Sequence, residues 1–317
     1  MPEAMRDVYG RALKALALRN GKIVALDADL SGSTKSGMLL PELRERHFNV
    51  GIAEANMAAM AAGFASCGFI PFINTFATVA ASSCMLALKS IAGYSSLEVR
   101  IAGSNIGLGG GYDGATHHCF DDLNVMRAIP GMKVLVPSDA RMLEWAVGAL
   151  GERLGGPAYM GVQRHPAEDI YSPDESFELG RAKRLRPGSD VAIIACGAET
   201  ARALRAAERL EELGISAAVV DMFTIKPLDR EAVEEAALGC GAIVTAEEHS
   251  IIGGLGSAVA ETLAELGVGA ALRRVGIRDR YTQSGSYGEL VELYSLDGGA
   301  IAAAAIEALK TKKGVRR

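Results

Sequence analysis

One carboxylate in the sequence stands out because nearly everything around it is apolar. Glu54 lies in the stretch Asn49-Val-Gly-Ile-Ala-Glu-Ala-Asn-Met57 and opens a segment rich in Ala, Met and Gly. A glutamate in the first turn of a helix gains about 0.3–1 kcal/mol from the helix dipole, which accounts for the residue without any function. These surroundings are too apolar for a solvated helix face, however, and burial raises the pKa of a carboxyl group. Such a carboxyl suits proton exchange with a heterocycle.

A glycine-rich segment, Gly109-Gly-Gly-Tyr-Asp-Gly114, leads to two adjacent histidines, His117 and His118. Adjacent histidines point in different directions and rarely bind one metal together, and the other three histidines show no metal-binding spacing with them. The alternative is that neither histidine has a function, with one exposed to solvent and the other packed in the interior. Because Asp113 lies four residues before His117, we favour a substrate-facing His117 that exchanges a proton or donates a hydrogen bond near neutral pH.

The same segment formally matches GxGxxG, the fingerprint of a dinucleotide site. That site requires a helix to open within the motif and an acidic residue near the end of the next strand. Helical periodicity resumes only near Asp121. We therefore favour a substrate loop or a tight turn.

Polar or aromatic residues follow four of the strands predicted in the first half of the chain. In open parallel sheets, ligands bind beyond the carboxyl ends of the strands. The residues at these ends are Asp27, Asp29, Ser31 and Ser33 after the first strand, Thr75 and Phe76 after the second, the loop from Asn105 to His118 after the third, and Arg164 after the last. Four such ends in one domain predict a site.

Short apolar strands alternate with helical stretches along all 317 residues. This alternation predicts an α/β protein with two domains, each a mainly parallel sheet with helices on both faces. A charged segment with three Pro-containing turns interrupts the pattern. We expect a first domain over residues 1–166, a linker over 167–188 and a second domain over 189–317.

Composition excludes several classes of protein. The formal charge of −5 and the pI near 5.7 argue against nucleic-acid binding, and no apolar run is long enough to span a bilayer. The N-terminus lacks the pattern of a signal peptide. Five cysteines at irregular spacing, without CxxC, make a disulfide framework and a zinc cluster improbable. We expect a cytoplasmic protein.

Three motifs together resemble transketolase, and the whole chain is similar to the small, C-terminal subunit of a split transketolase. They are residues 49–57, Leu26-Asp-Ala-Asp-Leu-Ser-Gly-Ser-Thr-Lys35 and Tyr112-Asp-Gly-Ala-Thr-His117. Further matches follow in the expected order at residues 126–132, 246–256 and 278–285. The resemblance implies a pyrimidine-binding domain followed by the transketolase C-terminal domain.

The resemblance also implies thiamine diphosphate as cofactor and transfer of a two-carbon ketol unit between phosphorylated sugars. Glu54 would hydrogen-bond the aminopyrimidine ring and activate the cofactor. The other implied roles are Phe76 stacking on the pyrimidine, Asp29 lying near the cofactor at a subunit interface, His117 facing the bound intermediate, Asp113 holding a substrate hydroxyl, and Arg6, Ser33 and Arg164 contacting the phosphate of the acceptor.

Half of such a site is missing from the sequence. Thiamine enzymes hold the diphosphate through Mg²⁺ with a Gly-Asp-Gly segment and a distant Asn, and this chain contains no Gly-Asp-Gly. We therefore expect a large partner subunit that supplies the diphosphate and Mg²⁺ contacts. This chain would form the homodimer inside an α₂β₂ assembly.

Several positions depart from the family pattern. Asn105 stands where the family generally has His, Tyr112 replaces a Glu, Ala55 follows Glu54 in place of Gln or His, and Val79 and Ser82 replace bulkier residues of the ring pocket. These changes favour a specialised ketose over the ordinary pentose phosphates.

Two alternatives stay open. The first is half of a related thiamine enzyme, such as the β subunit of a 2-oxo acid dehydrogenase or a deoxyxylulose-phosphate-synthase-like protein. The second is a catalytically silent subunit. The Ser284-Gly285 pair favours transketolase, and the retained Glu54, Phe76, Asp113 and His117 argue against silence.

Overall fold

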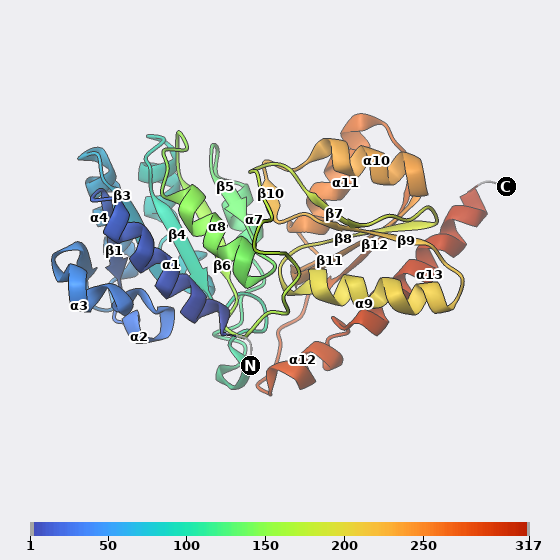
Figure 1. The fold of residues 1–317 in the computed structure, drawn as a ribbon, viewed down its shortest axis with the longest axis horizontal. Helices are drawn as coiled ribbons and strands as arrows, with labels where there is room; N and C mark the ends of the chain where they lie inside the picture. The colour runs from blue at the N-terminus through green and yellow to red at the C-terminus, as the bar shows by residue number, and fades with distance from the viewer. Residues whose placement is uncertain (1–2, 316–317) are drawn as a thin grey trace.

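The computed structural model describes residues 3–315 and contains two sheets, which confirms the expected α/β class. The two halves of the chain form neighbouring bodies, at the left and right of Figure 1. Within residues 3–315, no helix combines the length and the apolar character that crossing a bilayer requires.

The first sheet has seven strands in the order β10-β5-β6-β4-β3-β1-β2, parallel except for β10 against β5. The strands are β1 (Ile23–Asp27), β2 (His47–Asn49), β3 (Ile70–Phe76), β4 (Arg100–Ser104), β5 (Lys133–Leu135), β6 (Ala158–Val162) and β10 (Thr224–Lys226). β1, β4 and β6 are buried along their whole length. Burial on both faces explains why continuous apolar runs predict such strands.

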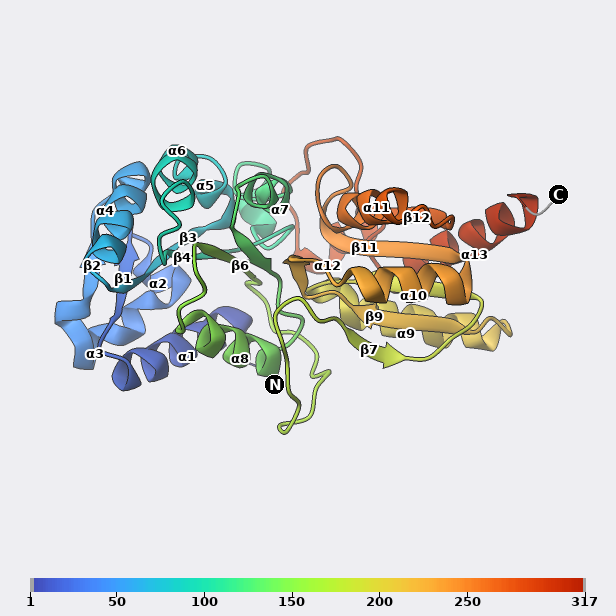
Figure 2. The same cartoon turned by 90° about the horizontal axis from the view of Figure 1, so that it is seen from above.

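Helices cover both faces of this sheet (Figure 2). α1 (Met5–Arg19) and α8 (Ala140–Leu150) pack on one face around Leu13, Phe72 and Leu143. The other face carries α4 (Glu54–Ser66), α5 (Ala77–Ala80), α6 (Met85–Ala87), a π-helical turn at Leu88–Gly93 and α7 (Asp122–Arg127). The short α2 (Ser31–Thr34) and α3 (Leu40–Leu43) follow β1.

The second sheet has five strands in the order β12-β11-β8-β9-β7, and only β7 is antiparallel. They are β7 (Lys183–Arg186), β8 (Val191–Ala195), β9 (Ala217–Asp221), β11 (Ala242–Ser250) and β12 (Ala271–Ile277). α9 (Ala198–Glu212), α12 (Tyr287–Leu293) and α13 (Gly298–Val315) cover one face, and α10 (Arg230–Cys240) and α11 (Leu255–Leu266) cover the other. The core under α10 and α11 is continuous with the core under α4.

The segment 167–188, expected as a linker, contains a strand of the second sheet. Residues Lys183–Arg186 form β7 and pair with β9. The alternation Lys-Arg-Leu-Arg hides this strand from the sequence, because a short edge strand carries charges where a central strand is apolar. The unpaired part of the linker therefore ends before Lys183.

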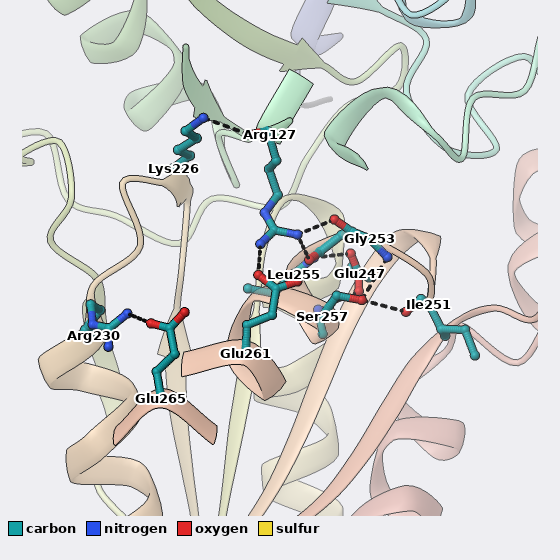
Figure 3. Close-up of polar contacts among 12 residues, drawn as sticks. Arg127, Lys226, Arg230, Glu247, Ile251, Gly253, Leu255, Ser257, Glu261 and Glu265 are labelled. Atoms are coloured by element: carbon teal, nitrogen blue, oxygen red, sulfur yellow. Dashed lines mark hydrogen bonds and ion pairs between the residues drawn. The ribbon is translucent and has the colours of Figure 1, made fainter. Parts of the chain in front are cut away.

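A polar cluster joins the two domains (Figure 3). Lys226 Nζ donates to the carbonyl oxygens of Arg127 and Ile129, at 2.7 and 2.6 Å, where α7 ends. The Arg127 guanidinium donates to the carbonyl oxygen of Gly253 at 2.5 Å and pairs with Glu261 at 2.7 Å. Each domain thus satisfies polar groups of the other.

Candidate functional site

The residues expected to do chemistry lie along one edge of the first sheet. β2, β1, β3, β4 and β6 run in parallel, so their carboxyl ends meet at this edge. Glu54 follows β2, Asp29 follows β1, Phe76 ends β3, Asn105 follows β4 and Arg164 follows β6. The strand order therefore gathers residues from five separate segments.

Glu54 is the first residue of α4 and is half-buried. Its carbonyl oxygen accepts a hydrogen bond from Cys84 Sγ at 3.4 Å. Burial, with the Glu54 carboxylate as a second cause, raises the pKa of Cys84 to about 12, so this thiol stays a donor. The apolar residues expected to enclose Glu54 lie partly on the surface, because Ile52 is 81% exposed and Ala55 and Ala59 also face solvent.

Exposed apolar residues also occur on the elements that pack beside α4. α6 and the π-helical turn pack beside α4, and they expose Leu86 and Ile91, while Tyr94 is exposed directly after the turn. We call Ile52, Leu86, Ile91 and Tyr94 the α4 surface. Exposed apolar residues that gather on neighbouring elements are typical of interaction sites in soluble proteins.

The two adjacent histidines occupy different environments. The half-buried His117 ring lies edge-on to Phe76, with the ring centroids 5.9 Å apart. His118 is buried, with Nδ1 2.6 Å from Thr282 Oγ1 and Nε2 3.2 Å from the carbonyl oxygen of Gly111. Burial lowers the pKa of His118, so the neutral ring donates from Nε2 and accepts from Thr282. His118 is an anchor, and His117 is the histidine beside Phe76.

Arg164 and Asp113 form an ion pair in which Arg164 Nη1 lies 3.1 Å from Asp113 Oδ2. Arg6 comes close to the same place, because Met5 N donates to the carbonyl oxygen of His165 at 3.2 Å. Burial lowers the pKa of His165, the Glu248 carboxylate opposes this shift, and the charges of Arg164 and Arg6 add to it. This corner therefore carries positive charge suited to an anion.

A salt bridge beside α2 places the helix that contains Ser33 near Arg6. Ser33 lies in α2, just before Lys35, and Lys35 Nζ pairs with Asp7 of α1 at 3.1 Å. This pair holds α2 beside the first turn of α1, which carries Arg6. The first turn of α1, with Arg6, thus lies beside α2 and beside the segment that follows β6.

The buried polar atoms at the sheet edge that have no hydrogen-bond partner within residues 3–315 include Thr75 Oγ1 and Asn105 Oδ1. Buried polar groups are normally paired, so orphaned atoms of this kind point to a ligand or an ordered water. Asn105 also has a positive φ of 60°, and Asp29 has one of 64°. Asp29 is exposed, with its amide 3.2 Å from Asn49 Oδ1.

The sequence did not reveal a second group of residues that contacts the loop between β4 and α7. Glu248, Arg202 and Tyr287 of the C-terminal domain form a buried hydrogen-bonded set that reaches Leu108. The available signal is the pair Glu247-Glu248 inside a strand that begins with an apolar run.

The chain matches two family models in order along its length. Residues 2–165 match the transketolase pyrimidine-binding domain, and residues 180–301 match the transketolase C-terminal domain. A putative transketolase C-terminal section from Methanocaldococcus jannaschii is 42% identical over 310 residues, covering 97% of each chain. The 6-deoxy-6-sulfo-D-fructose transketolase subunit SqwH from a Clostridium species is 41% identical and covers 97% of this chain and 95% of its own.

A solved structure is similar over its whole length. It is a split-gene transketolase described as an inactive β4 tetramer, 44% identical to this chain with a TM-score of 0.89. The alignment covers 98% of this chain and 100% of that one.

Proposed function

Because the chain belongs to the transketolase family, as the part that carries the pyrimidine-binding and C-terminal domains, we propose that it is the small subunit of a transketolase. The enzyme would transfer a two-carbon ketol unit between sugar phosphates. The observation that carries this proposal is the single sheet edge shared by Glu54, Phe76, His117 and Arg164.

Family membership implies dependence on thiamine diphosphate, and the residues of this chain fit the aminopyrimidine end of that cofactor. The orphaned atoms Thr75 Oγ1 and Asn105 Oδ1 lie at the same edge as the Phe76 ring. When bound, the cofactor supplies the nucleophilic carbon that accepts the two-carbon unit. Phe76 would stack on the ring, and Asp29 would lie at its border with the partner.

Glu54 would exchange a proton with a ring nitrogen of the aminopyrimidine. Its position at the first turn of α4 leaves the carboxyl group only half-buried in this chain. A partner that covers the α4 surface would complete the desolvation of this carboxyl group. Cofactor activation would thus require the assembled enzyme.

His117 and Asp113 would act on the sugar. His117, edge-on to Phe76, would donate a hydrogen bond to an oxygen at the reacting carbon, and Asp113 would accept one from a hydroxyl. Arg6, Ser33 and Arg164 would hold the phosphate, because their corner carries positive charge beside the loop that contains Asp113.

The diphosphate and Mg²⁺ would be held by a large subunit. This chain has no Gly-Asp-Gly segment, and residues 3–315 contain no group of three His, Cys, Asp or Glu placed to hold a metal. The α4 surface supplies the apolar contact area for such a partner. We propose an α₂β₂ assembly in the cytoplasm, with two copies of this chain paired inside it.

The substrate is a specialised ketose in this proposal. Asn105, Tyr112, Val79 and Ser82 depart from the usual transketolase residues, and a relative of comparable length is named for a sulfonated sugar. Arg6 and Arg164 could also bind an anionic group other than phosphate at the end of the sugar.

The test is co-expression with the large subunit, followed by ketol-transfer assays over a panel of phosphorylated and sulfonated ketoses. Glu54→Gln should lower turnover by about 10²–10⁴-fold. Glu208→Gln, the same change at an exposed glutamate of α9 in the C-terminal domain, is the control. Near wild-type turnover of Glu54→Gln, or no transfer from any donor by the complex, would contradict the proposal.

A further inference from the structure

The loop between β4 and α7 holds an unusual backbone shape. Asn105, Gly107, Gly111 and Gly114 all have positive φ angles, between 56° and 78°. The loop closes on itself through the amides and carbonyls of Gly107 and Cys119, at 2.9 and 3.0 Å. Its tip carries Asp113 and His117. Three of the four residues with positive φ are glycines, which adopt many backbone conformations, so contacts from outside the loop help to select one of them.

The C-terminal domain provides such a contact at the start of the loop. Leu108 is fully buried in the core of the C-terminal domain, with Val191, Ala246 and Leu290. Its amide donates to Glu248 Oε1 at 2.8 Å. A residue of the first domain is therefore held by both its side chain and its backbone inside the second domain.

Glu248 is in turn fixed by charged and aromatic neighbours. Glu248 Oε2 accepts from the Tyr287 hydroxyl at 2.6 Å and lies 3.4 Å from Arg202 Nη1. Arg202 also donates to Tyr287 at 2.8 Å and pairs with Glu199. The Glu248 and Arg202 side chains are only 7% and 9% exposed. These contacts hold the Glu248 carboxylate in one orientation.

Gly107 lies so close to Glu248 that it has no room for a side chain. A Cβ there would lie 2.5 Å from Glu248 Cγ and 2.6 Å from Glu248 Oε1. The far end of the loop is held in the same way, because a Cβ at Gly114 would lie 2.6 Å from Ser284 Oγ, and His118 bonds Thr282. The loop follows the shape of the C-terminal domain at both ends.

We infer that Glu248 is a positioning residue for ketol transfer, which sets the location of Asp113 and His117 by fixing the amide of Leu108. This inference rests on the proposed function for its consequence in catalysis, but the positioning itself can be measured without activity. A displacement of about 1 Å of a substrate-contacting group costs on the order of 10²-fold in rate.

The first measurement is amide hydrogen exchange on the full chain. Glu248→Ala should speed exchange at Leu108 and across residues 105–118 by about tenfold or more, since the amide loses its acceptor. Glu248→Gln keeps an acceptor oxygen and should restore most of the protection. The matched control is Glu247→Ala, because Glu247 is the neighbouring carboxylate in β11 and accepts from the amides of Leu255 and Gly256 instead.

The second measurement uses the assembled enzyme. Glu248→Ala should lower kcat by about 10²-fold and leave thiamine diphosphate affinity unchanged, with rescue by Glu248→Gln. Unchanged Leu108 exchange in Glu248→Ala would overturn the inference whatever the activity. An equal kcat loss in Glu247→Ala would also overturn it, as a general effect of stability. A wild-type complex without ketol transfer would refute the proposed function and leave the exchange result to decide positioning.

Discussion

Arg164 Nη1 lies 3.1 Å from Asp113 Oδ2, and this ion pair ties the end of β6 to the tip of the loop after β4. Both side chains are partly exposed, at 33% and 49%, so the pair can open to a ligand at small cost. A residue expected to bind phosphate and one expected to bind a sugar hydroxyl thus share one contact. The phosphate and the hydroxyl group of the substrate would therefore be recognised together.

Replacing Arg164 should therefore weaken binding of the anionic end of the substrate. Arg164→Gln removes a charged donor, and KM for a phosphorylated acceptor should rise by about 10- to 100-fold with a smaller change in kcat. Steady-state kinetics of the assembled enzyme measures this split. Arg181→Gln, which breaks an exposed ion pair with Glu231 in the C-terminal domain, is the control. An unchanged KM in Arg164→Gln would remove this arginine from the substrate site.

The α4 surface should be the contact for the large subunit. Ile52→Arg places a charge in the centre of an apolar contact, and association should weaken by about tenfold or more. Leu213→Arg is the matched control, because Leu213 is a comparably exposed leucine that follows α9 in the C-terminal domain. Titration of each variant with the large subunit gives the dissociation constants. Equal affinities would place the interface elsewhere.

The cluster around Arg127 should contribute to the coupling of the two domains. Arg127→Ala leaves the Gly253 carbonyl oxygen without this donor and should lower the free energy of unfolding by about 1–3 kcal/mol. Arg230→Ala removes an exposed pair with Glu265 inside one domain and should cost less than about 0.5 kcal/mol. Denaturant unfolding followed by circular dichroism compares the two variants. Equal losses would mean that Arg127 acts as an ordinary surface residue.

Asp221 should make stability depend on pH in a defined direction. Burial raises the pKa of this carboxyl group to about 7, although Tyr171 donates to it at 2.7 Å. In the unfolded chain the pKa of Asp is about 3.9, so the unfolded state loses its proton first and native stability falls as pH rises from about 4 to about 7.

Asp221→Asn removes that ionisation. Relative to that of the wild type, the unfolding free energy of the variant should rise by about 1–4 kcal/mol from about pH 5 to about pH 8. Asp174→Asn, at an exposed position, should track the wild type at every pH. Thermal unfolding across this range tests the expectation, and parallel profiles for wild type and Asp221→Asn would contradict it.

The sequence predicts those strands that are covered on both faces. β1, β8 and β9 are short apolar runs, and the structure confirms them. β7 and β10 escape prediction because one is a charged edge strand and the other has three residues whose partner, β5, lies 89 positions away from Thr224 in the chain. Pairing at such a distance leaves no local pattern.

The same distinction holds for the site. Glu54, Phe76 and Arg164 are predictable because a parallel sheet collects the residues at its carboxyl ends. Glu248 is not, because it meets Leu108 across 140 positions and its partners come from two further segments. The roles of the site residues remain predictions that the kinetic experiments test.

The antiparallel pairing of β10 with β5 also limits how the two domains can be recombined. Thr224 and Lys226 belong by sequence to the C-terminal half, yet they cover the edge of the first sheet at Leu135 and Val134. A fragment that stops after the first domain would expose this edge, and bare strand edges promote aggregation. A chimera that borrows the C-terminal domain of a relative must therefore match residues 224–226 to β5, although the chain joins the two domains nearly 40 residues earlier.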